Sequence, residues 1–531
     1  MEINFYTLSL IITFSFFLRI IFILFVKYPL NSYIIGDSST HWLLIKKIKK
    51  NKYNIKKLYI ENYLIPGKIS APILFHFFSS YFSIRILKKR PYLPNLIIYL
   101  LFIIFLFTYS LYFFSNISTQ PFELSIYVLL FFTLSINNFI FRGSQINYVL
   151  LSERLLGRLL TSFFIFTLFG YYSFGDNISL ILTLIFSTLI FLSSKFAIQA
   201  IVFFSLIFSL LMIDITPLII TFFGLLFAII ISKGYALRTI KLTFGFLIIY
   251  KKYLMKSIFK KPFLNTFIDL KDFLQILKSK SIKNILKYFF NKEPGRSLLI
   301  FSDLLIVFVL LIFFKDFNIF IENKFIILII ISCLMPYVVI SFKFFAFAGE
   351  SYRYLEYYLV FLAPFLIVYF SFINQFNILI IFFLYLFFNI FLIIYSILLR
   401  EKLTLDRNKN FLIKNNKKKD TIDEIIKSSN ITSKDVIFSV DMRLGVDIVS
   451  RTNCKTFWWQ PGGIVDKEIF SYFIEAYPFL SSKNYNEICK KYNVNKIIVN
   501  NLLYKDSGIK YNFDHLSVIS SNNQYTVFQY K

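Results

Sequence analysis

Long apolar stretches separated by short polar ones run through the first 400 residues. Most are close to the roughly 20 residues that an α-helix needs to cross a bilayer. Lipid offers no hydrogen-bond partner to a backbone, so each stretch is expected to be helical. We therefore predict an all-α polytopic membrane bundle of about 12–13 transmembrane helices. The candidate spans are 4–26, 69–87, 95–114, 122–141, 158–173, 177–194, 196–213, 216–232, 297–314, 324–345, 355–373 and 376–399.

Two polar regions within residues 1–400 have a different pattern. Residues 234–296 alternate lysine clusters with aromatic and aliphatic residues, which indicates amphipathic helices on the membrane surface. Residues 36–65 follow the first span, and a helix starting near Asp37 would carry an apolar stripe of Trp42, Ile45 and Ile48. Its lysines would then face lipid headgroups.

The chain beyond residue 400 resembles a soluble protein. A polar linker at 415–419 precedes alternating helix-like and strand-like segments, which predict a C-terminal soluble α/β domain over 401–531. The expected helices are Thr421–Lys427, Asp466–Tyr477 and Tyr485–Tyr492, and the expected strands are Val436–Val440, Lys496–Val499 and Gln524–Tyr530. Residues 1–400 form the membrane domain in this division.

Composition supports a membrane protein. The chain is 57% hydrophobic with a mean hydropathy of +0.66, above the average for soluble domains. Its formal net charge is +29, but many lysines lie between apolar spans, where they anchor loops to anionic headgroups. We expect membrane lipids and no nucleic acid as partners.

Cysteine and histidine are scarce. The three cysteines include no Cys-x-x-Cys pair, and only three histidines occur. We therefore predict no metal site and no required cofactor, although a divalent cation is compatible with the chain. Cys454 and Cys489 are either one disulfide or two free thiols.

Lysine and arginine in short loops predict the orientation. The basic run from Arg85 to Arg90 follows the second span and is expected in the cytoplasm, which places the N-terminus inside and Asp37 outside. Twelve spans would then return the C-terminal domain to the cytoplasm.

The polar segment Gly36-Asp37-Ser38-Ser39-Thr40-His41 offers the first candidate chemistry. Asp37 at the membrane surface could act as a general base toward a hydroxyl, with His41 one turn later on the same helix face. An aspartate before a helix is also a common N-cap.

Charged or polar residues within apolar spans are further candidates. Arg19 could hold a phosphate or extend to the interface, and His76 is either functional or a buried structural histidine. Arg154 and Arg158, one helical turn apart after Glu153, could grip a phosphate or anchor a loop.

A second candidate cluster precedes the eleventh span. Glu350 and Arg353 lie among tyrosines at a membrane boundary, and an arginine there suits bidentate phosphate recognition. In the C-terminal domain, Trp458 and Trp459 form either core or a platform for a sugar ring.

These pieces resemble the C-type-fold (GT-C) membrane glycosyltransferases, including protein O-mannosyltransferases and aminoarabinose transferases. The likeness rests on Arg19 in the first span, Asp37 in the first loop, Pro72 to His76 at the second span and Arg353-Tyr354-Leu355 before a late span. By this resemblance Asp37 is the catalytic base and Arg353, with Arg19, contacts the donor phosphate. His41, His76 and Glu350 are supporting residues.

The resemblance also implies which reaction the protein catalyses and on which side of the membrane it takes place. It predicts transfer of a sugar from a polyprenyl-phosphate donor to an extracytoplasmic glycan, lipid or protein acceptor. It places Arg353 and the C-terminal domain outside, against the count of twelve spans, and an extra crossing at Tyr235–Tyr250 would reconcile the two. We follow the resemblance. A transporter or flippase of lipid-linked saccharides and a non-catalytic assembly protein are the alternatives.

Overall fold

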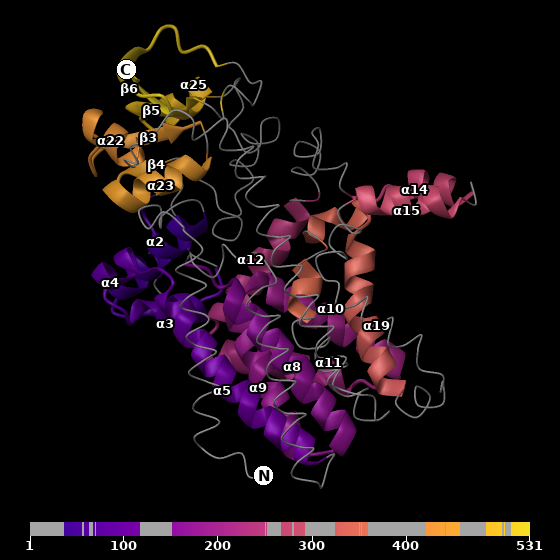
Figure 1. The fold of residues 1–531 in the computed structure, drawn as a ribbon. Helices are drawn as coiled ribbons and strands as arrows, with labels where there is room; N and C mark the ends of the chain where they lie inside the picture. The colour runs from indigo at the N-terminus through magenta and orange to yellow at the C-terminus, as the bar shows by residue number, and fades with distance from the viewer. Residues whose placement is uncertain are drawn as a thin grey trace, which may run out of the picture.

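The fold is taken from a computed structural model of the chain (Figure 1). The structure describes residues 37–55, 58–62, 67–68, 71–116, 151–249, 251, 267–278, 281–292, 324–349, 351, 353–358, 421–440, 442–456, 485–501, 504 and 511–530.

Six apolar helices pack together in the described part of residues 1–400. Three are long and apolar enough to cross a membrane: α5 (Leu93–Ser115), α8 (Arg154–Phe174) and α10 (Lys195–Met212). Shorter apolar helices accompany them: α9 (Asn177–Ser193), α11 (Thr216–Ile231) and most of α19 (Lys324–Ile340). All six coincide with predicted spans, whereas the spans 4–26, 122–141, 297–314 and 376–399 lie outside the described residues.

Small residues let these helices approach closely. A Cβ on Gly170 of α8 would lie 2.8 Å from the Ser179 hydroxyl of α9, and one on Gly224 of α11 would lie 2.6 Å from the Ser187 Cβ of α9. Close contact through Gly and Ser is typical of helices in lipid, where packing replaces the hydrophobic effect. Large side chains such as Ile181 and Phe222 stay exposed on the outside, as a lipid-facing surface requires.

The predicted second span, 69–87, is wrong as a single crossing. The structure breaks it into α3 (Leu74–Ser80) and α4 (Ile84–Lys89), and each is far shorter than a bilayer is thick. Helix α2 (Asp37–Lys50) contacts α3 and the turn that follows it. His76 of α3 meets His41, while Lys49 donates to the Phe82 carbonyl between α3 and α4. Residues 71–90 therefore lie beside α2, on the same side of the bundle.

Removing this crossing changes the predicted topology. The predicted count falls from twelve spans to eleven, and a count of eleven would place the C-terminal domain and Arg353 on the same side as Asp37 without an extra crossing at 235–250. The basic run Arg85–Arg90 also lies on the Asp37 side, which corrects its predicted separation from Asp37. The misassignment arose because an apolar segment covered by protein has the same composition as one covered by lipid.

Helix α2 is buried by protein rather than by lipid. Trp42, Ile45 and Ile48 are buried as an apolar stripe, but Leu43 and Leu44 on the remaining faces are buried as well. Lysines 46 and 49 donate to the carbonyls of Ser450 and Phe82, so the prediction that they face headgroups is wrong. A short antiparallel pair follows α2, formed by β1 (Tyr59–Ile60) and β2 (Gly67–Lys68).

The C-terminal domain is a mixed five-stranded sheet in the order β4-β3-β5-β7-β6. Strands β3, β4 and β5 are parallel, and β7 and β6 pair antiparallel on one edge. Their bounds are β3 (Val436–Ser439), β4 (Lys455–Thr456), β5 (Lys496–Asn500), β6 (Ser517–Ser521) and β7 (Tyr525–Gln529). The helices are α22 (Thr421–Ser428), α23 (Met442–Thr452) and α25 (Tyr485–Lys491). A predicted helix at Asp466–Tyr477 lies outside the described residues.

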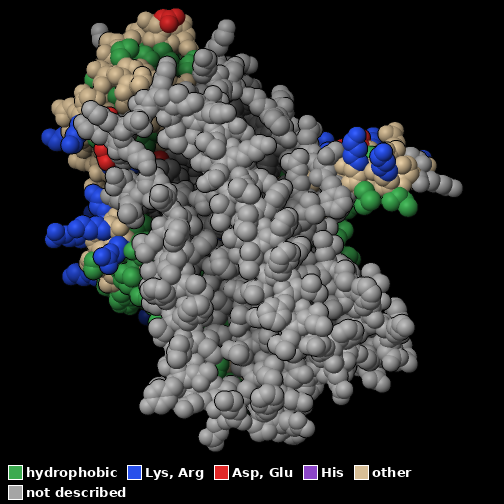
Figure 2. All heavy atoms as spheres, in the orientation of Figure 1, with side chains coloured by type: hydrophobic (Ala, Val, Ile, Leu, Met, Phe, Trp, Pro, Cys, Tyr) green, Lys and Arg blue, Asp and Glu red, His purple; other side chains and the backbone are tan. Residues whose placement is uncertain are grey.

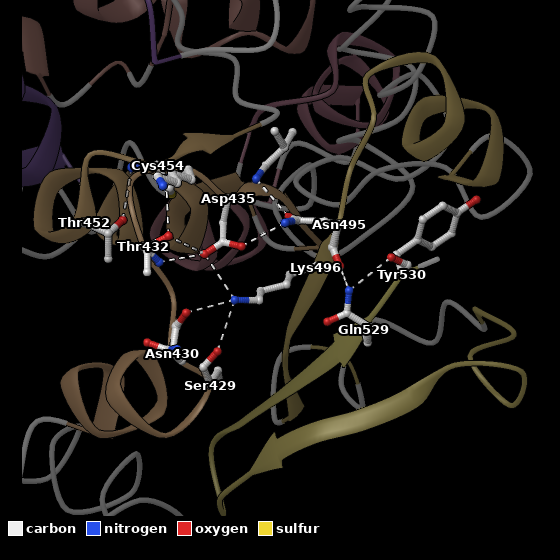
Figure 3. A network of polar contacts seen from close by, with 12 residues as sticks. Ser429, Asn430, Thr432, Asp435, Thr452, Cys454, Asn495, Lys496, Gln529 and Tyr530 are labelled. Atoms are coloured by element: carbon white, nitrogen blue, oxygen red, sulfur yellow. Dashed lines mark hydrogen bonds and ion pairs between the residues drawn. The ribbon is translucent and has the colours of Figure 1, made fainter.

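A buried ion pair secures this sheet (Figure 3). Asp435 before β3 lies 3.1 Å from Lys496 of β5, and the lysine also donates to the carbonyls of Ser429 and Asn430. Because each charge has further hydrogen-bond partners, the pair joins α22, β3 and β5 without leaving a buried charge uncompensated.

This domain rests on α2 (Figure 1). The Ser39 hydroxyl donates to the buried Asp447 carboxylate of α23, and the backbone N–H of Thr456 donates to the Asn62 carbonyl. Leu43, Leu44 and Ile48 share one apolar core with the C-terminal sheet. The domain and the first-loop helix thus form one packed unit at one end of the bundle.

A helical hairpin projects from the same end of the molecule. Helices α14 (Leu270–Lys278) and α15 (Ile282–Asn291) join the end of α19 through a backbone bridge between Ile268 and Phe342. Figure 2 shows lysines on the upper side of the hairpin and apolar side chains on its lower side. The exposed apolar residues are Leu270, Leu274, Leu277, Ile282 and Leu286. Helix α12 (Tyr235–Ile249) and the 3₁₀ turn η4 (Lys343–Ala348) complete the described elements.

Candidate functional site

The N-terminal end of α8 is the place where the elements that carry His41, His76 and Arg353 meet. Gly157 there packs so closely on Ser194 that an added Cβ would lie 2.7 Å from the serine Cβ. This contact brings the start of α10 against the start of α8. Helices α2 and α3 reach the same place through His41 and His76.

Glu153, His41 and His76 form a chain of contacts just before α8. The His41 Nε2 lies 2.9 Å from the Glu153 carboxylate, and its Nδ1 lies 2.7 Å from the His76 Nε2. The second nitrogen of His76, Nδ1, lies 2.8 Å from the Pro72 carbonyl. Both histidines are buried. Three separate elements, α2, α3 and the segment before α8, therefore converge on one polar cluster.

Electrostatics fix the charge of two of these groups. Burial lowers the pKa of His76 to about 3, and neighbouring His41 acts in the same direction. Burial alone would raise the pKa of Glu153, but His41 and His76 outweigh it, and the pKa is lowered. At neutral pH His76 is uncharged and Glu153 is a carboxylate.

A second buried pair lies one turn deeper in α8. The Arg158 guanidinium donates to the Glu356 carboxylate, and both side chains are almost fully buried. The Ser162 hydroxyl donates to the Tyr357 carbonyl at 3.1 Å. These contacts attach the helical segment 353–358 to α8.

The same segment packs on the start of α10. The Arg353 guanidinium stacks over the Phe196 ring, 4.3 Å from its centroid, an arrangement that stabilises a cation beside an aromatic face. Tyr358 donates to the Ala200 carbonyl at 2.8 Å. Arg353 is therefore held at the end of α10 that carries Lys195, which itself interacts with Glu153.

Basic groups outnumber acidic ones among the described residues at this end. Arg154, Arg158, Lys195 and Arg353 are cationic, whereas Glu153 and Glu356 are the carboxylates in contact with them. An excess of positive charge at a partly buried site favours an anionic ligand.

The structure describes some of the predicted site residues and not others. The backbone of Asp37 begins α2, one turn before His41, and Arg353 lies at the same end of the bundle through the α8 contacts. His76 contacts His41 directly. Arg19, Glu350, Trp458 and Trp459 lie outside the described residues. The roles of all these residues stay predictions.

One predicted arrangement is wrong. Arg158 does not pair with Arg154 around an open phosphate site or anchor a loop to headgroups, because it is buried and bound to Glu356. The open question on the cysteines is also answered, since Cys454 and Cys489 are free, buried thiols.

Sequence reasoning missed three partners at this end: Glu153 for His41, Glu356 for Arg158, and Lys195 beside Glu153. A signal was present, because each is a charged residue at the edge of an apolar span. The His41–Glu153 and Arg158–Glu356 pairs join residues that are 112 and 198 positions apart. No local sequence pattern records contacts over such distances.

No protein-family model matches the chain, and no curated protein sequence matches it.

Proposed function

We propose that the protein is an integral membrane glycosyltransferase that moves a sugar from a polyprenyl-phosphate donor to an extracytoplasmic glycan, lipid or protein acceptor. The observation that carries the proposal is the common location of the elements that bear Asp37 and Arg353. Both lie at the end of the bundle where α8 begins, next to a cluster with excess positive charge. A phosphate-bearing donor suits that charge.

The proposed reaction divides between two residues. Asp37 accepts the proton of the acceptor hydroxyl as its oxygen attacks the anomeric carbon. The bond from that carbon to the phosphate oxygen breaks, and polyprenyl phosphate leaves with the electron pair. Arg353 stabilises the charge that develops on this phosphate. Glu153, His41 and Glu356 act at a distance, by holding α2 and the 353–358 segment against α8.

The test compares Asp37→Asn with the intact protein in lipid nanodiscs. Polyprenyl-phosphate hexose and pentose donors, labelled in the sugar, are supplied with a membrane extract as the source of acceptors. Loss of a general base lowers the rate by about 10²–10⁴-fold. Asp423→Asn is the matched control, because Asp423 is an exposed carboxylate paired with Arg451 on the C-terminal domain. Equal turnover by the Asp37→Asn variant would overturn the proposal.

The same assay separates an enzyme from a transporter of lipid-linked saccharides. Transporter sites lie near the bilayer midplane, whereas the His41–His76 contact lies at one end of the bundle, beyond the start of α8. A transporter would move the labelled donor across the membrane with its sugar–phosphate bond intact.

A further inference from the structure

Two of the three histidines in the chain face each other inside the protein. The His41 Nδ1 and the His76 Nε2 are 2.7 Å apart, and the two rings meet end to end, with centroids 4.9 Å apart and planes inclined by 24°. They come from different helices, α2 and α3, and both are buried. Contact between two buried imidazole nitrogens requires a proton or a metal ion between them, because two lone pairs at this distance repel.

The outer nitrogen of each histidine has its own acceptor. The His76 Nδ1 lies 2.8 Å from the Pro72 carbonyl, which can only accept, so this nitrogen carries the hydrogen. The His41 Nε2 lies 2.9 Å from the Glu153 carboxylate. Histidines that bind metals almost always donate their second N–H to a carboxylate or a backbone carbonyl, which aims the remaining lone pair at the ion. Both kinds of acceptor are present here, one on each ring.

We propose that His41 and His76 bind one divalent transition-metal ion of the zinc class between Nδ1 and Nε2, with Glu153 and the Pro72 carbonyl orienting the rings. Neutral imidazole is a preferred ligand of Zn²⁺ and Co²⁺. The Glu153 carboxylate supplies negative charge next to the buried cation. Because ligand nitrogens on a tetrahedral zinc are about 3.3 Å apart, the rings must separate by roughly 0.6 Å on binding.

This assignment does not depend on sugar transfer. Water or an anionic ligand oxygen would complete the coordination, as at zinc sites that keep an open position. The excess of cationic side chains at this end, including Arg353 and Lys195, suits such an anion. A metal here would also tie α2 to α3 and stabilise the layer on which the C-terminal domain rests.

Metal content and Co²⁺ spectroscopy test the proposal on the full-length protein. The purified protein is stripped with a chelator and titrated with Co²⁺, whose visible absorption reports coordination by nitrogen, and Zn²⁺ is then added as competitor. We expect one ion per chain in the unmodified protein. His41→Gln and His76→Gln should each lose the ion, and Glu153→Gln should weaken binding by about 10–100-fold, as loss of an orienting partner does.

His515→Gln is the matched control. His515 is the third histidine of the chain and is exposed on the C-terminal domain, so this variant should bind Co²⁺ like the unmodified protein. Absence of a stoichiometric ion in the unmodified protein would overturn the proposal and leave a shared proton between the rings. This measurement uses only the unmodified protein, so it does not depend on whether a variant folds. Equal binding by His76→Gln and His515→Gln would also overturn it.

Discussion

Several buried polar side chains in the described part of the chain are paired across elements that are distant in sequence. His41 contacts His76 and Glu153, Arg158 binds Glu356, and Asp435 binds Lys496. A buried charge costs several kcal/mol unless it is paired, so each pair also fixes which elements lie together. At this scale, the sequence identified His41, His76 and Arg353 as notable but could not identify their partners.

The Asp435–Lys496 pair predicts acid sensitivity of the C-terminal domain. Burial alone would raise the pKa of Asp435, but hydrogen bonds from Thr432, Lys496 and Asn495 outweigh it and lower the pKa below 3.8. A carboxyl whose pKa is lower in the folded state stabilises that state above its unfolded pKa of about 3.9, and this stability is lost as the pH falls through the folded value. The domain should therefore unfold more readily below about pH 4.

Buried thiols report this unfolding in the full-length protein. Cys454 and Cys489 are buried in the C-terminal domain, and a thiol reagent that is active in acid should reach them faster as the pH falls from 6 to 3. Asp435→Asn should be destabilised at pH 6 and should show a smaller acceleration. Identical acceleration in both proteins would show that the Asp435 carboxyl does not control the transition.

At the scale of elements, local patterns predicted β3, β5, β7, α22 and α25 of the C-terminal domain. The predicted strand Val436–Val440 is β3, Lys496–Val499 is β5 and Gln524–Tyr530 contains β7, because short β-branched runs between polar turns carry a strong local signal. Strands β4 and β6 and helix α23 were not predicted, and Ser517–Ser521 of β6 is rich in serine. The 69–87 error has the opposite cause, because the apolar signal was strong but the contact that covers it is tertiary.

The contact between α2 and α23 gives the first element-scale prediction. Ser39→Ala removes the hydroxyl that donates to the buried Asp447 carboxylate, and removing one hydrogen bond to a buried carboxylate costs about 1–3 kcal/mol. If this cost lowers the free energy of local opening of α2, amide hydrogen exchange in α2 should accelerate by about 5–150-fold.

A matched control is Ser428→Ala, which removes an exposed hydroxyl–hydroxyl contact with Ser520. Exchange in α2 should not change in this variant. Unchanged exchange in Ser39→Ala as well would mean that the C-terminal domain does not stabilise α2 through this contact.

The α14–α15 hairpin is predicted to lie on the membrane surface with its apolar face in lipid. Leu286 and Asn284 are both exposed on α15 but lie on nearly opposite faces of the helix. Each is replaced by cysteine and labelled with an environment-sensitive fluorophore in nanodiscs; the native cysteines in the described structure are buried. Emission from position 286 should be shifted to the blue relative to position 284, and equal emission would contradict insertion.

For the whole molecule, the main finding is that one end carries the polar chemistry. Helix α2, the 353–358 segment, the C-terminal domain and the amphipathic hairpin all lie there (Figure 1). At the opposite end, Asp176 caps α9, and Asp214 accepts from the backbone N–H and hydroxyl of Thr216 and from the Tyr172 hydroxyl of α8. The sequence predicted a helical membrane domain and a C-terminal α/β domain, but it could not give their relative placement.

The resemblance and the basic residues predict opposite sides of the membrane for this end. The resemblance to C-type-fold glycosyltransferases implies the extracytoplasmic side. The four lysines between residues 46 and 50 and the basic run 85–90 lie at the same end, and by the positive-inside rule they favour the cytoplasm. Short loops rich in lysine lose predictive value in a chain with a net charge of +29, so we retain the extracytoplasmic assignment.

Cysteine labelling in intact expressing cells tests this central claim most directly. Glu61→Cys places an exposed thiol beside α2, and Asn177→Cys places one at the far end of the bundle. With a membrane-impermeant maleimide, we predict that position 61 is labelled in intact cells and that position 177 is labelled only after permeabilisation. Labelling of position 177 in intact cells, with position 61 protected until permeabilisation, would contradict an active site on the extracytoplasmic side.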